Sequence, residues 1–348
     1  MEYYSLNRYL QDTFGEKLYK IAVNAGFTCP NRDGTLGTCG CIFCSGSGSG
    51  DFAEVPSLSV TEQIEKGKAR VEKKFRGGRY IAYFQAFTNL YAPVSRLREL
   101  FTEAIRHPDV AVLSVATRPD CLPDEVIALL AELNREKPVW VELGLQTIHE
   151  KTAKFIRRGY SLSAYDDAVR RLKAADLAVI THVILGLPGE TPEMMKDTVR
   201  HVVQISKTYS RKEFVDRRKT DSGYRHVKCQ KSDPGISEKT EVQGCSVRTR
   251  DGIKLQLLHV LEETDLADAY RRGDFEVLTL EQYTKLVCEC LALLPENFVV
   301  HRITGDGAKR LLLAPLWSAD KKRVLNTLNA AIRAYDPDAK NAAEMYNK

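Results

Sequence analysis

The amino-acid sequence predicts an α/β fold in which six parallel strands form an open or partial β/α barrel. Two observations support this prediction: short β-rich runs alternate with longer helical patterns, and the segments between the runs carry recognisable helix starts. In such a TIM-like partial (β/α)6 barrel, functional side chains lie at the carboxyl ends of the strands. The expected strands are Lys20–Asn24, Arg79–Gln85, Ala111–Ala116, Val139–Gln146, Ala178–Leu185 and Ile253–Val260.

The expected helices begin at residues that favour a helix start. Ser59 with Glu62 three residues later fits a capping box. Thr191 before Pro192 fits an N-cap followed by proline at the first helical position. Apolar residues then recur at helical spacing, as in segment 126–133. These patterns predict helices between consecutive strands.

We divide the chain into an N-terminal segment (1–18), the barrel (19–262) and a small C-terminal α/β extension (263–348). Within the barrel, residues 206–250 are polar and basic and have no sustained apolar period, so we expect a mobile insertion before the sixth strand. The extension is expected to contain a helix, a short strand and a terminal helix, at Leu280–Leu294, Phe298–Ile303 and Lys321–Tyr335.

Charge and hydropathy argue against a membrane-spanning or secreted protein and permit a polyanionic partner. The 348-residue chain has a net charge of +5, to which residues 206–250 contribute +6, with twelve Lys/Arg against six Asp/Glu. No segment approaches the roughly 18 consecutive apolar residues of a membrane span, and the N-terminus lacks the basic-then-apolar order of a signal peptide. We therefore expect a cytoplasmic protein without membrane contact, whose basic stretch would suit a polyanion.

The cysteines point to a metal site. In a reducing compartment, nine cysteines are more typical of thiols or metal ligands than of disulfides. One glycine-rich loop directly after the first expected strand contains four of them: Cys29, Cys39, Cys41 and Cys44. Thiolates suit both iron and zinc, so this loop is the candidate metal centre.

The number of coordinating thiolates decides what this loop does. Four thiolates would complete a tetrahedral zinc site, whereas three would leave one iron of a [4Fe-4S] cluster open to a small molecule. A single residue separates Cys39 from Cys41, which makes joint ligation awkward. We therefore expect Cys29, Cys41 and Cys44 to be the ligands, with a structural zinc knuckle that uses all four cysteines as the alternative.

The cysteine loop also resembles a known family. The segment CPNRDGTLGTCGCIFCSGSGSGDF is similar to the YtqA/YhcC-like bacterial radical S-adenosylmethionine (SAM) family, a relative of the radical SAM domain of the elongator catalytic subunit. Cys39 departs from the family pattern, in which this position is usually glycine. The likeness continues outside the insertion in YFQAFTNLYAPV, TRPDCLPDEV, VELGLQTIHEKT, HVILGLPGET, IKLQLLHVL and HRITGDG.

The resemblance implies an enzyme with a [4Fe-4S] cluster and SAM as cofactors. An electron from a donor such as flavodoxin or ferredoxin would cleave SAM and generate a 5′-deoxyadenosyl radical. The resemblance further implies that Glu142 and Gln146, near the end of the fourth strand, make polar contacts to SAM and that Arg158 pairs with the SAM carboxylate. Gly186 and Gly189, after the fifth strand, would let the backbone approach the adenine.

Other polar residues near the expected strand ends are candidates for contact with the substrate: Gln85, Thr88, Asn89, Arg118 and Asp120. Single histidines in apolar segments, such as His182, are more typical of hydrogen-bonded structural residues than of groups that transfer protons.

Some members of this family are associated with the wobble uridine of tRNA, where a carboxymethylaminomethyl side chain becomes aminomethyl. The resemblance therefore implies tRNA as the substrate, and the basic stretch would suit its phosphates. Two alternatives are kept: a radical SAM enzyme that acts on a small molecule or protein, and a non-catalytic, zinc-stabilised RNA-binding protein.

Overall fold

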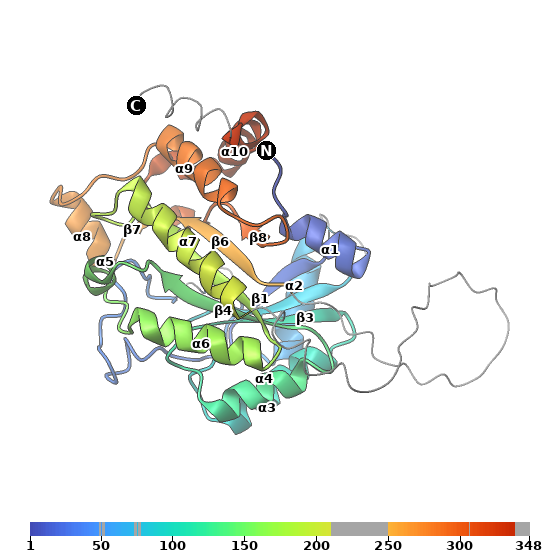
Figure 1. Cartoon of the computed structure of the whole chain (residues 1–348). Coiled ribbons are helices and arrows are strands. Elements are labelled where there is room, and N and C mark those ends of the chain that lie inside the picture. The colour runs from blue at the N-terminus through green and yellow to red at the C-terminus, as the bar shows by residue number, and fades with distance from the viewer. Residues whose placement is uncertain are drawn as a thin grey trace, which may run out of the picture.

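The computed structural model describes residues 1–48, 50, 53–72, 75, 78–209, 250–305 and 307–337. In these residues a curled sheet of seven parallel strands, in the order β1-β2-β3-β4-β5-β6-β8, forms a half-barrel (Figure 1). The predicted partial barrel is therefore confirmed. The strands are β1 (Tyr19–Val23), β2 (Tyr80–Phe84), β3 (Val110–Thr117), β4 (Val139–Gln146), β5 (Ala178–Leu185), β6 (Gly252–Leu257) and β8 (Val299–Arg302).

The sheet contains one strand more than the six predicted. β8 comes from the segment expected to form the extension, yet it pairs in parallel with β6, where Gly252 is opposite Val299 and Ile253 is opposite Val300. An apolar run indicates a strand but carries no information about the sheet edge that it joins. The two expected helices of the extension are present as α9 (Leu280–Ala292) and α10 (Lys321–Ala334).

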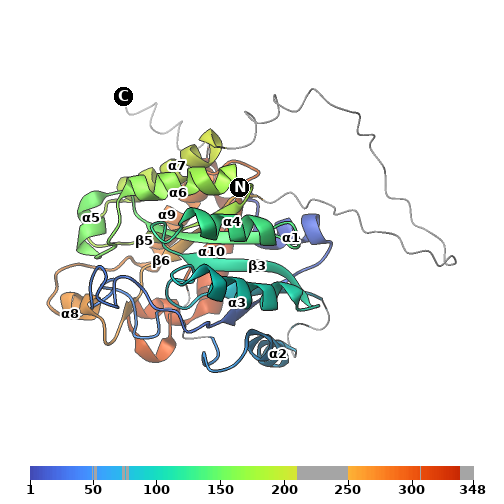
Figure 2. The ribbon, with the colours of Figure 1, turned by 90° about the horizontal axis from the view of Figure 1, so that it is seen from below.

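Helices surround the outside of the curled sheet (Figure 2). They are α2 (Val60–Val71), α3 (Val94–Arg106), α4 (Asp124–Leu133), α6 (Leu162–Ala174) and α7 (Pro192–Thr208). The short helix α5 (Glu150–Phe155) follows the carboxyl end of β4, and α8 (Asp265–Arg271) packs with Ile42 of the cysteine loop. The predicted capping box of α2 is confirmed, since Ser59 and Glu62 exchange hydrogen bonds between side chain and backbone. Thr191 caps α7, with Pro192 in its first turn.

A helix that was not predicted, α1 (Leu6–Phe14), closes the amino-terminal end of the barrel. Its Tyr9 and Leu10 are buried against Trp140 of β4 and the inward side chains of neighbouring strands. Outside the barrel, β7 (Val260–Leu261) and β9 (Leu312–Ala314) form a small antiparallel sheet, with short 3-10 helices η3 (Lys309–Leu311) and η4 (Leu316–Ala319) beside β9.

The alternation of side chains along β4 separates the core from the site. Val139, Val141, Leu143 and Leu145 belong to the main apolar core. Glu142, Gly144 and Gln146 lie between them in sequence and therefore point to the opposite, concave face of the sheet. With the amino-terminal end filled by apolar side chains, the polar interior opens at the carboxyl ends of the strands.

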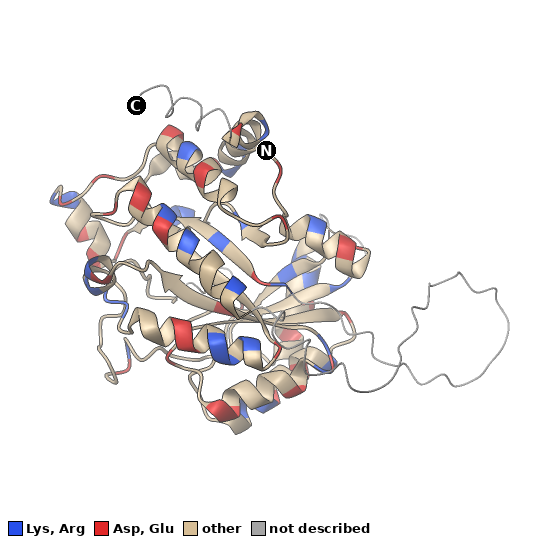
Figure 3. Cartoon of the chain, in the orientation of Figure 1, with Lys and Arg blue, Asp and Glu red and all other residues tan. Residues whose placement is uncertain are grey.

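The basic stretch 206–250 begins in the last turn of α7, and its residues 210–249 lie outside the described part of the chain. The expected mobile insertion is therefore not tested. Among the helices of the described residues, none has both the length and the apolar character needed to cross a membrane, and Figure 3 shows Lys, Arg, Asp and Glu at intervals along them.

Candidate active site

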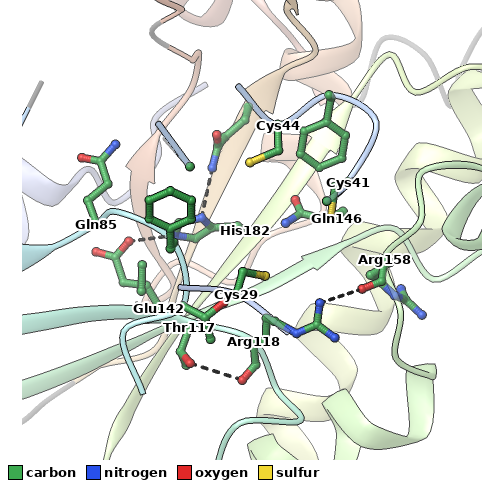
Figure 4. Close-up of a pocket in the computed structure, with 18 of the residues that line it drawn as sticks. Cys29, Cys41, Cys44, Gln85, Thr117, Arg118, Glu142, Gln146, Arg158 and His182 are labelled. Atoms are coloured by element: carbon green, nitrogen blue, oxygen red, sulfur yellow. Dashed lines mark hydrogen bonds and ion pairs between the residues drawn. The ribbon is translucent and has the colours of Figure 1, made fainter. Parts of the chain in front are cut away.

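A pocket lies at the carboxyl ends of the strands, where the barrel was expected to carry its functional residues. Its space, including the open solvent at the mouth, is about 1030 Å³. The wall combines the cysteine loop with residues of β2, β3, β4, β5, β6 and β8 (Figure 4). Of the predicted site residues, the pocket brings together Cys29, Cys41, Cys44, Glu142, Gln146 and Arg158.

Three of the four loop cysteines face this pocket. Cys29, Cys41 and Cys44 are half-buried in its wall, whereas Cys39 is exposed and lies outside the lining. The donor set therefore fits a cluster with three protein thiolates and one open iron better than a site closed by four. Burial raises the pKa of the Cys41 thiol to about 11, so metal binding there would release a proton.

Two side chains give the cysteine loop its shape. Arg32 donates from Nη2 to the carbonyl oxygens of Cys44 and Ser45, both at 2.8 Å. Gly40 makes room for Arg32, because a Cβ at position 40 would lie 2.8 Å from the arginine Nε. Asn31 donates from Nδ2 to Cys41 Sγ at 3.5 Å and to the carbonyl oxygen of Arg157 at 2.8 Å. The loop is thereby attached to the segment that follows α5.

Arg158 holds the end of β4 in place. Its side chain is 1% exposed and donates to the carbonyl oxygens of Leu145 (3.2 Å), Thr147 (2.5 Å) and Tyr160 (2.9 and 3.0 Å). Four of the five guanidinium N–H groups are used in this way, which leaves one for a ligand. Arg158 reaches the pocket wall, but the structure does not test its predicted pairing with the SAM carboxylate.

Gln146 occupies an unusual backbone conformation at the end of β4. Its φ is 67°, a left-handed value that costs free energy for a residue with a side chain, and the pairing of β4 with β5 shifts register here. The side chain folds back over Gly144, where a Cβ would lie 2.9 Å from Gln146 Nε2. Such strain is typical of functional positions, which supports the predicted contact of Gln146 with a cofactor.

Gly186 and Gly189 follow β5 with φ values of 95° and 80°, so their backbone suits glycine. Neither glycine is part of the pocket wall. A Cβ at Gly186 would approach the side chain of Leu278 at 3.2 Å, whereas none of the described atoms lies within 4 Å of one at Gly189. The structure therefore does not bring these two glycines together with the other predicted SAM contacts.

Glu142 is the centre of a buried charge network. Its Oε1 accepts hydrogen bonds from Lys20 Nζ (2.8 Å) and Ser114 Oγ (2.6 Å). Its Oε2 accepts from His182 Nε2 (2.7 Å) and from Lys254 Nζ. Burial opposes ionisation, but Lys20 and Lys254 outweigh it and hold the pKa of the Glu142 carboxyl well below its usual range. Glu142 is therefore an internal anion whose four protein partners already occupy both oxygens.

His182 is neutral in this network. Burial and then the charge of Lys254 lower its pKa from 6.5 to about 4. Because the Glu142 carboxylate can only accept, Nε2 of His182 carries the proton and Nδ1 accepts from Gln256 Nε2 at 3.2 Å. The expectation of a hydrogen-bonded histidine agrees with these contacts.

Sequence reasoning missed several residues of the pocket interior. Tyr83, Lys254, Gln256 and Arg302 line the pocket, and Lys20 lies outside the lining but donates to Glu142. One signal was present: Lys254 and Gln256 interrupt an apolar strand at a spacing of two, which places both side chains on the same face. A lysine inside a central strand needs a partner of opposite charge, and Glu142 interrupts another apolar strand in the same way.

The predicted residues near the strand ends divide into two groups. Gln85, Thr88 and Arg118 line the pocket. Asn89 is fully buried and donates to the carbonyl oxygen of Ala116, so it supports the wall from behind. Asp120 pairs with Arg118 at 2.7 Å without lining the pocket.

Comparison with known proteins agrees with this geometry. Residues 24–202 match the Radical SAM superfamily, and residues 250–334 match the Radical_SAM C-terminal domain. The uncharacterized protein YtqA of Bacillus subtilis (strain 168) is 41% identical over 327 residues, which cover 94% of this chain and 88% of YtqA. Protein YhcC of Escherichia coli (strain K12) is 33% identical over 309 residues, 88% of this chain and 85% of YhcC.

More distant similarity extends to archaeal proteins. A tRNA uridine(34) acetyltransferase of Methanocaldococcus infernus is 23% identical over 304 residues, 76% of this chain and 49% of that protein. The structure of the archaeal M. infernus Elp3 with an N-terminal deletion has a TM-score of 0.56 at 16% identity, over 88% of this chain and 63% of that one, which shows a shared fold. The chain belongs to the radical SAM superfamily of enzymes and, within it, to the YtqA/YhcC-like family.

Proposed function

We propose that this protein cleaves SAM reductively at a [4Fe-4S] cluster held by Cys29, Cys41 and Cys44, and that it uses this chemistry to modify the wobble uridine of tRNA. The proposed reaction converts a carboxymethylaminomethyl side chain to aminomethyl by cleavage of the bond between the nitrogen and the carboxymethyl carbon. After hydrogen abstraction from that carbon and return of one electron to the cluster, water would hydrolyse the resulting C=N bond and release the two-carbon fragment as glyoxylate, with SAM consumed as the oxidant. The observation that carries the proposal is the convergence of these three cysteines, without Cys39, on a pocket at the open end of a radical SAM half-barrel.

The bound cofactors would supply a 5′-deoxyadenosyl radical that abstracts a hydrogen atom from the substrate, with an electron from a donor such as flavodoxin or ferredoxin. The residues of the chain itself would bind the cofactors and the substrate and orient them toward one another. Arg32 and Asn31 hold the cysteine loop, and Arg158 fixes the end of β4 so that Gln146 faces the pocket. At the amino-terminal end of the barrel, apolar side chains packed around Trp140, including Tyr9 and Leu10 of α1, exclude water from the interior.

Support for tRNA as substrate comes from two sources. The M. infernus relative, about half of whose length matches this chain, is a tRNA uridine(34) acetyltransferase, so a distant relative acts on a tRNA uridine. The net charge of +6 in residues 206–250 would suit phosphate contacts.

The test is an anaerobic assay of the dithionite-reduced, cluster-loaded protein. The expected result is 5′-deoxyadenosine whose formation bulk tRNA stimulates, together with loss of the carboxymethyl group from wobble uridine as measured by mass spectrometry of tRNA nucleosides. The Cys44→Ser variant is the control without an intact cluster site. Formation of 5′-deoxyadenosine that tRNA does not stimulate, with unchanged nucleosides, would favour a small-molecule or protein substrate instead.

A further inference from the structure

The pocket wall carries an excess of positive charge. Of the described residues that line it, one is acidic, Glu142, and five are basic: Arg32, Arg118, Lys254, Arg158 and Arg302. Local partners account for several of these cations, because Arg118 pairs with Asp120 and Arg158 is bound by backbone carbonyls. Lys254 has to share the carboxylate of Glu142 with another lysine.

Two lysines face one carboxylate in the barrel interior. Lys20 bonds to Oε1 of Glu142 and Lys254 to Oε2, while the third ionisable neighbour, His182, is neutral at pH 7. This group of four side chains therefore has a net charge of +1 when both lysines are protonated and Glu142 is ionised. Lys254 is 3% exposed and shares its counter-ion with Lys20, and burial lowers the pKa of its ammonium group well below the usual range. An anionic ligand beside Lys254 would therefore stabilise its charged form.

The Lys254 ammonium also has a free donor and a fixed position. It has three N–H groups, of which one goes to Glu142 and one to Tyr83 Oη at 3.2 Å. No third partner is found among the described residues, so one N–H remains for a ligand. The ammonium lies 4.5 Å from the centre of the Tyr83 ring, and this contact helps to hold it in place before a ligand arrives.

Lys254 lies deeper in the barrel than Gln146 and the cysteine loop, at the level of Glu142. It precedes Gln256 by two residues along β6, which corresponds to about 7 Å along a strand. Glu142, its partner, precedes Gln146 by four residues along β4. Figure 4 shows Gln146 close to Cys41 and Glu142 well away from that pair. A group that reaches Lys254 therefore lies beyond the cysteine loop, toward the floor of the pocket.

We propose that Lys254 is a specificity-determining residue that binds a carboxylate of the substrate at the floor of the pocket. This inference rests on the proposed function and deepens it. The carboxymethylaminomethyl side chain ends in a carboxylate that the aminomethyl product lacks. Substrate binding would supply a second negative charge for the two lysines that share Glu142. Loss of the carboxylate in the reaction would remove this charge, which favours release of the product.

The first test uses the cluster-loaded protein with SAM present. Affinities are measured for tRNA with carboxymethylaminomethyl and with aminomethyl at the wobble uridine. The wild-type protein should prefer the first tRNA; Lys254→Met should weaken its binding by roughly ten- to a hundredfold and remove the preference. Lys254→Arg keeps the charge and should retain the preference. Iron content and thermal unfolding verify that both variants fold.

Two outcomes would overturn the inference. An unchanged preference in Lys254→Met would show that another group recognises the carboxylate. A weakened affinity for SAM in this variant, with the tRNA preference intact, would show that Lys254 binds the carboxylate of SAM.

A second test separates the carboxylate site from the tRNA function. N-methylglycine reproduces the end of the proposed side chain, and its binding to the cluster-loaded protein is measured by calorimetry. Binding should be at least about tenfold weaker in Lys254→Met than in the wild type. Equal binding, or none to the wild type, would overturn the inference. Lys254-dependent binding without any conversion of tRNA would instead overturn the proposed substrate and leave the carboxylate site established.

Discussion

Glu142 on β4 and Lys254 on β6 form a buried ion pair across the intervening strand β5. In a flat sheet, two strands separated by a third lie roughly 10 Å apart, and their side chains stand parallel to one another. The curl of the half-barrel tilts the side chains on its concave face toward one another, so that the carboxylate and the ammonium meet. The charge at the floor of the pocket is thus a consequence of sheet curvature.

Removal of the charge of Glu142 should destabilise the protein strongly. Glu142→Gln leaves the buried Lys254 and the half-buried Lys20 without an anion, and loss of one partner from a buried pair costs about 3–5 kcal/mol. The free energy of unfolding in urea measures the effect. Glu132→Gln is the matched control, because Glu132 pairs with Arg98 at a site where both side chains are about half exposed and water screens the charges, so its loss should have a much smaller effect. Similar losses in the two variants would contradict the network.

Stability should fall in acid because of His182. Its pKa in the folded protein is about 4 instead of 6.5, so the unfolded chain takes up the proton first as the pH falls. The contribution of neutral His182 is therefore fully present above about pH 6.5 and is lost as the pH falls toward 4. Urea unfolding at pH 7, 6 and 5 should show a smaller pH dependence in His182→Gln than in the wild type; an equal dependence would assign the acid sensitivity to other groups.

The cysteines should differ in their effect on iron content. Serine at Cys29, Cys41 or Cys44 should abolish the reconstituted cluster, because each change removes a ligand, whereas Cys39→Ser should retain about four irons per chain. Iron and sulfide analysis of anaerobically reconstituted protein measures this. A Cys39→Ser protein that loses its cluster would show that the exposed thiol is a ligand.

The Gln146→Gly variant should distinguish the effect of Gln146 on stability from its effect on SAM binding. Gln146→Gly relieves a left-handed backbone, so the free energy of unfolding should stay within about 1 kcal/mol of the wild type. The affinity for SAM should fall by up to about tenfold, because a hydrogen-bonding side chain is lost. Asp176→Gly is the control, since Asp176 has a φ of 62° just after α6 and lies outside the pocket. Unchanged SAM affinity in Gln146→Gly would exclude the predicted contact.

The parts of the fold and of the site that could be predicted are formed by short continuous segments of the chain. The cysteine loop, the capping box at Ser59 and the seven strands of the sheet depend on spacing over a few residues. The side chains of Lys20, Tyr83 and Lys254 escaped prediction because they come from three separate strands. Each looks like an isolated polar interruption until the barrel brings them together around Glu142.

The sequence by itself determined the α/β class, the positions of the strands, the thiol spacing of the cysteine loop and the family. These features depend on periodicity, turn chemistry and short-range spacing, which act locally. The tertiary structure alone decided that β8 pairs with β6, that Cys39 stays outside the pocket, and that Glu142 meets a lysine 112 residues away. Such contacts depend on how the whole sheet curls, because curvature sets which distant side chains share the interior.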